Sequence, residues 1–432
     1  MSQARVSLEL TPLSSCRMVR EMINTFEYKL RVNKKFVSAC EEKLEQSRFV
    51  YNCALEHFKL NYQQKPYAHY SISYPMLSRE LTAARRELPE VGVCLRMIQT
   101  DALERFELAK QAFFRRVRNG EKPGYPRFKS RDRYHTFAQK IEPQRGCPLK
   151  GDKLMVPGVG TCRVRLSRRL EGTVKQLRIT RRADGWFALL VCEMEAPAPL
   201  PKTGDTVGID VGLEYFATLS TGEVIENPRH LRKTERELNK ASRRVSRRKK
   251  GGSGRKKAIL LLRKAHLRVQ RRRKDHHYKA ANKIVKEFDV IAVEDLKIKN
   301  MVRNPHLAKS ISDAGWGQFL AILSVKAESA GREFEKVSPA YTSQDCSQCG
   351  ERVRLSLATR TYRCLVCNFE APRDCNAALN VRARALGSND RGSNQRADCS
   401  APSAMRGEVG PARDTENRGG TERVVTHSVG RA

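Results

Sequence analysis

The chain has 432 residues, with 83 lysines and arginines against 47 acidic residues and a net charge of +36. Such an excess is unfavourable through self-repulsion unless a polyanion neutralises it, so a nucleic-acid partner is favoured over a protein that is merely basic and soluble. No run of about 18 apolar residues is present, which excludes a membrane-spanning helix. Residues 1–22 lack the apolar stretch of a signal peptide. The 13 cysteines are an odd number, and most stand alone, which fits a reducing compartment.

The first part of the chain predicts a helical bundle and a β-domain. Residues 24–32 alternate between apolar and polar positions, as a strand does, whereas apolar residues between about 35 and 118 recur every three or four positions, as in helices. Residues 154–194 again have the pattern of strands, and Asp184-Gly185 is a signal for a type I′ hairpin. If the early strand joins the later sheet, the helices are an insertion into a β-domain. The expected parts are an extension (1–22), a β-domain (23–34 and 116–200) and an inserted helical domain (35–115).

Two features of this part are candidates for nucleic-acid contact. Polar positions on the helices, such as Gln99, are expected to be exposed, although an ordinary solvated face is the simpler interpretation. The segment 119–131 is rich in Pro and Gly, which favours an extended loop, and aromatic residues alternate in it with Arg127, Lys129 and Arg131. Such a loop suits a sugar–phosphate backbone, with rings available to stack on bases. A basic linker between domains is the alternative.

A further domain is expected over residues 201–386. It begins with Thr206-Val-Gly-Ile-Asp-Val-Gly212, an apolar strand that carries Asp210 and runs into glycine, and a hairpin over 215–225 follows. The next segment, 229–274, holds 21 lysines and arginines and only two acids, and a glycine-rich break divides it into two helices. This density favours a wall that follows phosphates over an ordinary solvated face. The candidate contacts are Arg243, Arg244, Arg247, Arg248, Arg271 and Arg272.

The same domain continues with a buried strand and ends with a helix. Residues 288–293 are almost continuously apolar, and Glu294 follows at the end of the strand where open α/β sheets bind ligands. An amphipathic helix and a strand come next, over 315–337, and the last helix begins at Asp374. Residues 387–432 are rich in Gly, Ser, Asn and Arg without a period, so we expect a disordered tail.

Two Cys-x-x-Cys pairs, separated by 14 residues, lie near the end of this domain. They are Cys346, Cys349, Cys364 and Cys367. Two such pairs complete a tetrahedral Zn²⁺ site. Four thiolates leave no open position, so we predict one structural zinc in a ribbon at about 340–372, with a redox pair as the alternative. Such a ribbon can present Arg352 and Arg354 to nucleic acid.

Asp210, Glu294 and Asp374 are expected to meet in one catalytic site. Mg²⁺ prefers oxygen ligands, and two such ions about 4 Å apart can orient an attacking water and neutralise a leaving oxygen. We therefore predict phosphodiester cleavage with two Mg²⁺ ions, or Mn²⁺ in their place. Each acid alone has a simpler explanation, namely a turn, a sheet rim and a helix N-cap. Asp289 and Asp295 are close enough in sequence to be confused with Glu294.

Four motifs resemble those of the TnpB family of insertion-sequence proteins, which are similar to the miniature type V CRISPR effectors. They are Gly208-Ile-Asp-Val-Gly212, Val293-Glu-Asp-Leu296, Tyr341-Thr-Ser-Gln-Asp-Cys-Ser-Gln-Cys-Gly350 and Asp374-Cys-Asn-Ala-Ala-Leu-Asn380. Pro126-Arg-Phe-Lys129 and Ile311-Ser-Asp-Ala-Gly-Trp316 also fit, and the resemblance covers about residues 24–386. The departures are the N-terminal extension, the long tail and Cys375 within the last motif.

This resemblance implies a transposon-encoded, RuvC-like nuclease of the ribonuclease-H fold, guided by RNA transcribed from the transposon end. It implies a multi-domain α+β chain, in which a recognition bundle is inserted in a wedge β-domain and a zinc ribbon is inserted in the nuclease domain. Family members read a short transposon-adjacent motif on duplex DNA, and the guide then pairs with the target. The resemblance gives the same three acids as metal ligands and the same four cysteines as zinc ligands. The expected partners are a guide RNA and double-stranded DNA, in the cytoplasm and nucleoid of a prokaryote, with no membrane.

Other functions stay open at this point. A guide-bound DNA-binding repressor should have lost a carboxylate, and this chain keeps all three. An accessory transposase that joins DNA strands is a second alternative, and a plain RNA-binding zinc-ribbon protein, which would gain nothing from the acids, is a third. His276-His277 looks like a ligand pair, but its position within a basic helix favours packing or a phosphate contact.

Overall fold

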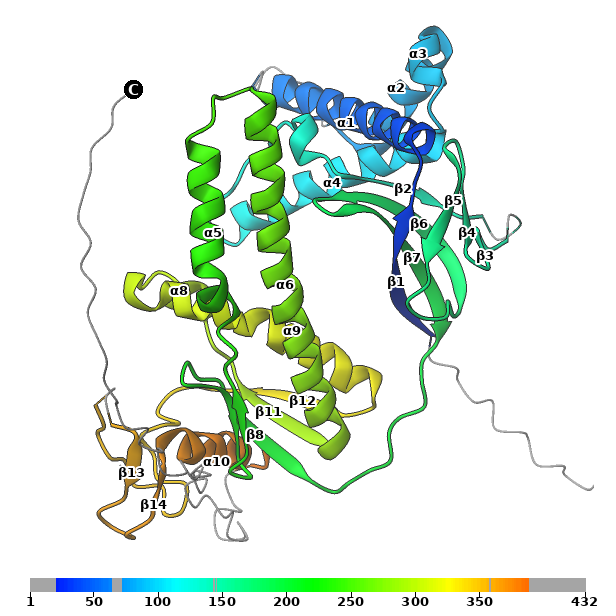
Figure 1. Ribbon diagram of the computed structural model, residues 1–432. Coiled ribbons are helices and arrows are strands. Elements are labelled where there is room, and N and C mark those ends of the chain that lie inside the picture. Colours follow the sequence, from blue (N-terminus) through cyan, green and yellow to red (C-terminus); the bar gives the residue numbers. More distant parts are fainter. Residues whose placement is uncertain (1–20, 64–71, 143, 145, 357–358, 388–432) are drawn as a thin grey trace, which may run out of the picture. The chain divides into compact units, whose positions relative to one another are not determined.

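The computed structural model describes residues 21–63, 72–142, 144, 146–356 and 359–387 (Figure 1). Apart from residues 21, 22 and 387, the predicted extension and the predicted disordered tail lie outside these ranges. The chain is a mixture of helices and sheets and divides into two compact units. The first unit comprises the described residues up to Thr206, Asn227–Ile291 and Lys297–Glu335, and the second comprises Val207–Glu226, Ala292–Leu296 and the described residues from Lys336.

A seven-stranded sheet forms much of the first unit, with the order β2-β6-β7-β1-β5-β4-β3. Its strands are β1 (Glu21–Arg31), β2 (Thr136–Lys140), β3 (Leu149–Lys150), β4 (Lys153–Val156), β5 (Gly160–Arg165), β6 (Thr173–Arg182) and β7 (Gly185–Glu195). β1 pairs antiparallel with β7 over Glu21 to Lys29 and with β5 over Lys29 to Arg31. The prediction that the early strand joins the later sheet is therefore confirmed.

The predicted helices between β1 and β2 are also present. They are α1 (Lys34–Gln63), α2 (Tyr74–Glu87), α3 (Pro89–Gly92) and α4 (Arg96–Arg118). Helices and sheet share one hydrophobic core, to which β1 contributes Tyr28 and α4 contributes Phe106. The expectation of an exposed Gln99 is wrong, because this side chain is buried and donates to the carbonyl of Val91 at 2.8 Å.

The hairpin predicted at Asp184-Gly185 joins β6 to β7, but its turn differs from the expected type. Ala183 and Asp184 are the central residues, and neither has a positive φ. A type I′ turn needs positive φ at both central positions. Gly185 follows the turn with φ 133°, so the turn lies one residue earlier than predicted.

The basic segment forms two helices, as predicted, and a third packs with them in the same unit. α5 (His230–Ser246) lies against α6 (Ser253–Glu287), and α6 also lies against α9 (Trp316–Ser329). α7 (Ile298–Met301) and α8 (Pro305–Ala314) connect β11 to α9. None of the helices in the described ranges is long and apolar enough to cross a bilayer.

The strand order β10-β9-β8-β11-β12 defines a second, five-stranded sheet. Its strands are β8 (Thr206–Asp210), β9 (Tyr215–Leu219), β10 (Val224–Glu226), β11 (Val290–Glu294) and β12 (Glu333–Val337). In the second unit, α10 (Arg373–Ala385) lies against β9, and β13 (Thr361–Arg363) pairs with β14 (Glu370–Pro372). Two of the predicted acids, Asp210 and Glu294, are the last residues of neighbouring strands of this sheet.

Candidate metal centres

The first candidate centre is built by β8, β11 and the start of α10. Asp210 ends β8, Glu294 ends β11, and Asp374 lies in the first turn of α10. The turn after β8 lies close to that helix: a Cβ placed on Gly212 would be 3.6 Å from Oδ2 of Asp374. The side chain of Asp374 therefore lies beside the chain that leaves Asp210.

Gly208 explains how the helix comes so close to the strand. A Cβ at this position would lie 2.1 Å from the carbonyl oxygen of Ala378 and 2.5 Å from the amide nitrogen of Arg382. Contacts under 3.0 Å to backbone atoms are not tolerated, so only glycine lets β8 and α10 approach backbone to backbone. The strand that carries Asp210 and the helix that carries Asp374 are thus in direct contact.

The charges of Glu294 and Asp374 both act on Asp210. Burial raises the pKa of Asp210 well above its usual value, and the charges of Glu294 and Asp374 raise it further, while Arg373 opposes them. Burial also raises the pKa values of Glu294 and Asp374. Glu294 is buried, whereas Asp210 and Asp374 keep part of their surface exposed.

This donor set fits a divalent cation. The ligands are carboxylate oxygens, which hard ions such as Mg²⁺ and Mn²⁺ prefer, and burial disfavours their ionised form in the absence of a cation. The carboxylates are less tightly gathered than the cysteines: within the described ranges, only the cysteines form a group of three or more whose ligand atoms all lie within 4.8 Å of one another. A wider site suits ions that keep some of their water ligands.

Neither of the acids that resemble Glu294 in sequence belongs to this cluster. Asp289 precedes β11, and its carboxylate accepts hydrogen bonds from the backbone N–H groups of Thr203 and Gly204 and pairs with Arg332. These contacts lower the pKa of Asp289, so its role is structural. Asp295 is exposed, and its nearest cation is the Nζ of Lys336 at 3.8 Å.

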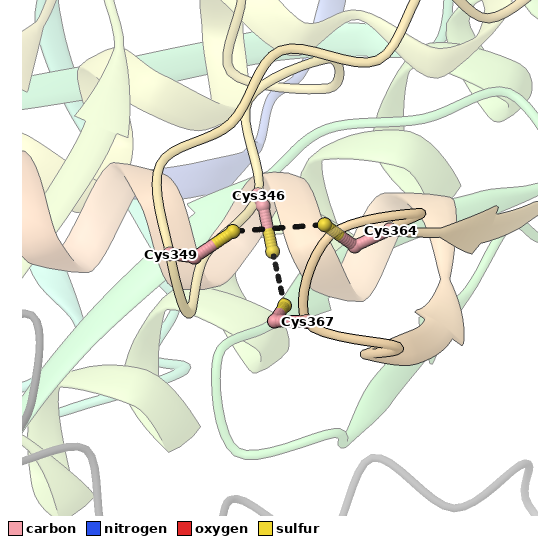
Figure 2. A group of neighbouring side chains, drawn as sticks. All are labelled: Cys346, Cys349, Cys364 and Cys367. Atoms are coloured by element: carbon pink, nitrogen blue, oxygen red, sulfur yellow. Dashed lines mark hydrogen bonds between the residues drawn. The ribbon is translucent and has the colours of Figure 1, made fainter.

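The second candidate centre consists of the four cysteines (Figure 2). Their sulfur atoms all lie within 4.8 Å of one another. The Sγ atoms of Cys346 and Cys367 are 3.6 Å apart, as are those of Cys349 and Cys364. Gly350, with φ 81°, donates its N–H to the carbonyl of Cys346 and closes the first turn. A tetrahedron of four thiolates is typical of a structural zinc site, and the cluster could hold a metal ion of this kind.

The residues proposed to contact nucleic acid lie in the first unit. Arg127, Arg131, Arg243, Arg244, Arg247, Arg248 and Arg272 have exposed side chains. Lys129 is half-buried, its backbone is bonded to Asn52 of α1, and its Nζ lies 5.6 Å from the ring centre of Tyr51. Arg271 donates to Asp184 at 2.7 Å, so it has a protein partner on the β6–β7 turn. As contacts to nucleic acid, all nine remain predictions.

The paired histidines pack within the protein. His277 is fully buried, and its Nε2 lies 2.9 Å from the carbonyl oxygen of Ala314 at the end of α8. Burial lowers the pKa of His277 to about 4, so the ring is neutral near pH 7. The described contacts therefore favour packing for His277.

Sequence reasoning missed three polar residues that link the carboxylate cluster to the first cysteine turn. Thr342 donates to Glu294, and Asn376 and Asn380 of α10 hold the loop that carries Thr342 and the first cysteines. All three lie inside motifs already singled out in the sequence. Their place within those motifs was the available signal, but only the fold shows which groups they contact.

Comparisons with known proteins show which family the chain resembles. A family model described as "Probable transposase" (OrfB_IS605) matches residues 189–305, and one described as "Cas12f1-like, TNB domain" matches residues 316–381. The chain is 30% identical to a protein of Streptomyces pristinaespiralis named "Putative RNA-guided DNA endonuclease", over 85% of this chain and 91% of that protein. It is 28% identical to "Putative RNA-guided DNA endonuclease InsQ" of Escherichia coli, over 84% and 92%. A shorter match, 33% identical over 28% of this chain and 24% of the relative, is to "TnpB-like protein L79" of Acanthamoeba polyphaga mimivirus.

Proposed function

Because this chain belongs to the TnpB family, we propose that it is a transposon-encoded, RNA-guided DNA endonuclease that requires Mg²⁺. The observation that carries this proposal is the placement of the three acids: Asp210 and Glu294 end neighbouring strands, and Asp374 begins the helix whose backbone contacts the strand of Asp210. A binding protein gains nothing from burying uncompensated carboxylates, because each buried charge is unfavourable without a partner. A metal-dependent nuclease requires them.

The three acids would hold the metal, with Asp210 and Glu294 as the principal ligands and Asp374 completing the site. When bound, two Mg²⁺ or Mn²⁺ ions supply an activated water and stabilise the leaving oxygen of the DNA backbone. The protein contributes the separation and orientation of the carboxylates. Partial exposure of Asp210 and Asp374 leaves the site accessible to a phosphate.

We assign the parts of the chain by the family organisation. Residues 23–34 and 116–200 form the wedge domain, and residues 35–115 form the recognition domain inserted in it. Residues 201–386 form the RuvC-like nuclease domain with a ribonuclease-H fold. The ribbon at about 340–372 is inserted there and holds one structural Zn²⁺, for which the four clustered sulfurs are the support.

The partners follow from the charge and the family. A guide RNA transcribed from the transposon end would bind the basic helices α5 and α6, whose surrounding segment carries 21 of the 83 lysines and arginines. Double-stranded DNA is the substrate, read first at a short adjacent motif and then by pairing with the guide. The repressor and accessory-transposase alternatives share this scaffold, but no described contact favours either of them.

Substitution of one acid tests the proposal. We expect Asp210→Ala to abolish Mg²⁺-dependent cleavage of target DNA by the protein–guide complex, while guide RNA binding stays near the wild-type level. Asp295→Ala is the matched control, because this exposed acid lies outside the cluster and should leave cleavage unchanged. Equal cutting by Asp210→Ala and the wild type would refute the site.

Purification provides an independent check on the partners. The protein should carry one zinc per chain and a discrete RNA, and sequencing of that RNA should identify a transposon-end transcript. A protein that carries only random cellular RNA would be a generic basic binder rather than a guided nuclease.

A further inference from the structure

The cysteine cluster and the carboxylate cluster are joined by a short chain of buried hydrogen bonds. We propose that Thr342, Asn376 and Asn380 are positioning residues, through which the folded cysteine ribbon fixes the orientation of the Glu294 carboxylate for metal binding. This inference rests on the proposed function, because it names residues that prepare the same site. None of the three side chains needs to touch the metal or the DNA.

Thr342 is the contact with the carboxylate cluster. Its Oγ1 lies 2.5 Å from Oε1 of Glu294, and both residues are buried. The hydroxyl has one proton, and its other acceptor, the carbonyl of Pro339, is farther away at 3.2 Å. A short bond to an ionised acceptor is the stronger of the two. Thr342 therefore occupies one oxygen of Glu294 and limits rotation of the carboxylate, so that the other oxygen keeps a fixed direction.

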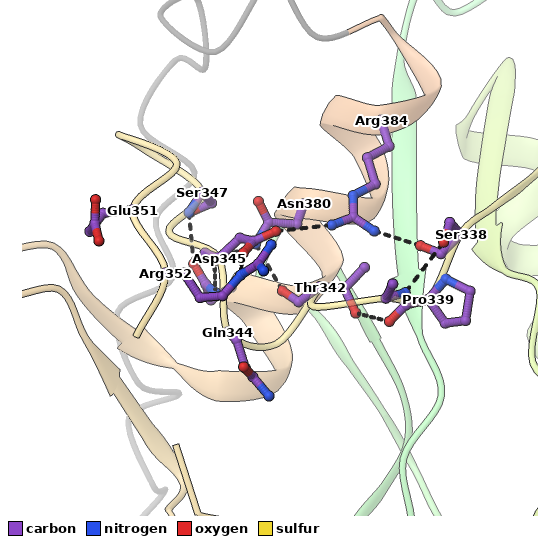
Figure 3. A network of polar contacts seen from close by, with 12 residues as sticks. Ser338, Pro339, Thr342, Gln344, Asp345, Ser347, Glu351, Arg352, Asn380 and Arg384 are labelled. Atoms are coloured by element: carbon purple, nitrogen blue, oxygen red, sulfur yellow. Dashed lines mark hydrogen bonds and ion pairs between the residues drawn. The ribbon is translucent and has the colours of Figure 1, made fainter. Parts of the chain in front are cut away.

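Asn380 connects Thr342 to the helix that carries Asp374. Its Nδ2 donates to the carbonyl of Thr342 at 2.8 Å and to the carbonyl of Asp345 at 2.7 Å. Both N–H groups of this side-chain amide therefore donate to carbonyls of the same loop (Figure 3). Because Asp374 and Asn380 share α10, a shift of the loop relative to this helix would move the Thr342 hydroxyl and so change the orientation of the Glu294 carboxylate.

Asn376 connects the same helix to the first cysteine turn. Its Nδ2 donates to the carbonyl of Asp345 at 2.9 Å, and its Oδ1 accepts from the N–H of Ser347 at 3.0 Å. These two bonds hold the residues on either side of Cys346. Asn376 is fully buried, so no water replaces the bonds when they are lost.

Asp345 strengthens this junction with charged contacts. Its carboxylate accepts from Arg352 at 2.7 Å and from Arg384 of α10 at 3.2 Å, and Arg384 also donates to the carbonyl of Ser338 at 2.6 Å (Figure 3). The loop from Ser338 to Ser347 is therefore tied to α10 at several points. Residues next to metal ligands that fix their orientation commonly change metal affinity 10–100-fold when removed.

A pair of substitutions at Thr342 separates positioning from packing. Thr342→Val keeps the shape but removes the hydroxyl, and Thr342→Ser keeps the hydroxyl but removes a methyl group. The control is Thr361→Val, on the exposed side of β13 in the same ribbon. The guide-bound proteins are titrated with Mn²⁺ without DNA, and free Mn²⁺ is measured by electron paramagnetic resonance.

We expect Thr342→Val to weaken Mn²⁺ binding by about 10–100-fold, Thr342→Ser to bind close to the wild type, and Thr361→Val to be unchanged. The Mg²⁺ concentration for half-maximal cleavage should rise for Thr342→Val and stay close to the wild-type value for Thr342→Ser and Thr361→Val. Wild-type affinity in a folded Thr342→Val protein would overturn the role of Thr342. If the wild type itself binds no Mn²⁺, or Asp210→Ala still cleaves, the proposed function fails instead.

Asn380→Asp tests the link to the ribbon. This change keeps the shape but replaces the amide donor by a carboxylate oxygen that repels the two carbonyls. We expect weaker Mn²⁺ binding even though residue 380 bonds to neither Glu294 nor Asp374, with zinc content showing that the ribbon is intact. Unchanged Mn²⁺ affinity in the zinc-loaded variant would refute the link.

Discussion

The two candidate metal centres are assembled in opposite ways. The four cysteines lie within residues 346–367, on two tight turns, and their sulfurs gather within 4.8 Å. The acids at positions 210, 294 and 374 come from two strands and a helix, and burial raises the pKa of each. The cysteine centre is thus a local structure that a metal can complete, whereas the acidic centre depends on a fold that exists before the metal arrives.

The largest effect expected from this difference is at the cysteines. Structural zinc contributes apparent binding free energies of about 10–16 kcal/mol in small domains, so its loss should unfold the ribbon. We expect Cys364→Ser to lose zinc, to become sensitive to protease between residues 340 and 372, and to lose cleavage. Zinc analysis and limited proteolysis measure this.

Cys53→Ser is the matched control for that experiment, because Cys53 is an exposed free cysteine on α1. It should keep zinc, protease resistance and cleavage. A zinc-free Cys364→Ser protein that still resists protease would show that the two centres do not differ in the way described.

At the acidic centre, replacing a proposed metal ligand should increase the stability of the metal-free protein rather than unfold it. A raised pKa means that the ionised carboxylate is less favourable in the folded protein than in the unfolded chain, so Asp210 destabilises the fold wherever the pH exceeds its ordinary pKa. We expect Asp210→Asn to raise the free energy of unfolding without Mg²⁺ by on the order of 1 kcal/mol, to keep zinc and to lose cleavage. Chemical denaturation in Mg²⁺-free buffer measures this free energy of unfolding. A clear loss of stability in Asp210→Asn would contradict a destabilising role for Asp210.

A smaller difference is expected between the effects of replacing two arginines on the ribbon. Both side chains are exposed, but that of Arg352 pairs with Asp345 and lies 3.6 Å from the ring centre of Tyr341. If the ribbon contacts DNA, Arg354→Ala should weaken binding at low salt and reduce the salt dependence by about one phosphate contact. Arg352→Ala should instead lower stability slightly, because an exposed ion pair contributes little. Equal effects of the two substitutions on DNA binding would contradict this assignment.

The difference between local assembly and assembly from distant parts of the chain also explains which features could be predicted from the sequence. Cys-x-x-Cys spacing is local, so the cysteine cluster was predictable from the turn that brings two thiolates together. Helices and strands followed from apolar periodicity, as for β1 and α6. The bonds of Asp289 to Thr203 and Gly204 were not predictable, because they join residues far apart in the chain. The role of Thr342 was hidden for the same reason, and Gln99 was misjudged because a polar residue can be buried when the fold supplies its partners.

Gly208 limits how this protein can change by mutation. The strand and the helix that carry the first and last acids touch through their backbones, with no side chain between them. Even alanine, commonly a conservative replacement, adds a methyl group where backbone atoms already stand. Variant libraries intended to retune metal preference should therefore keep this position constant.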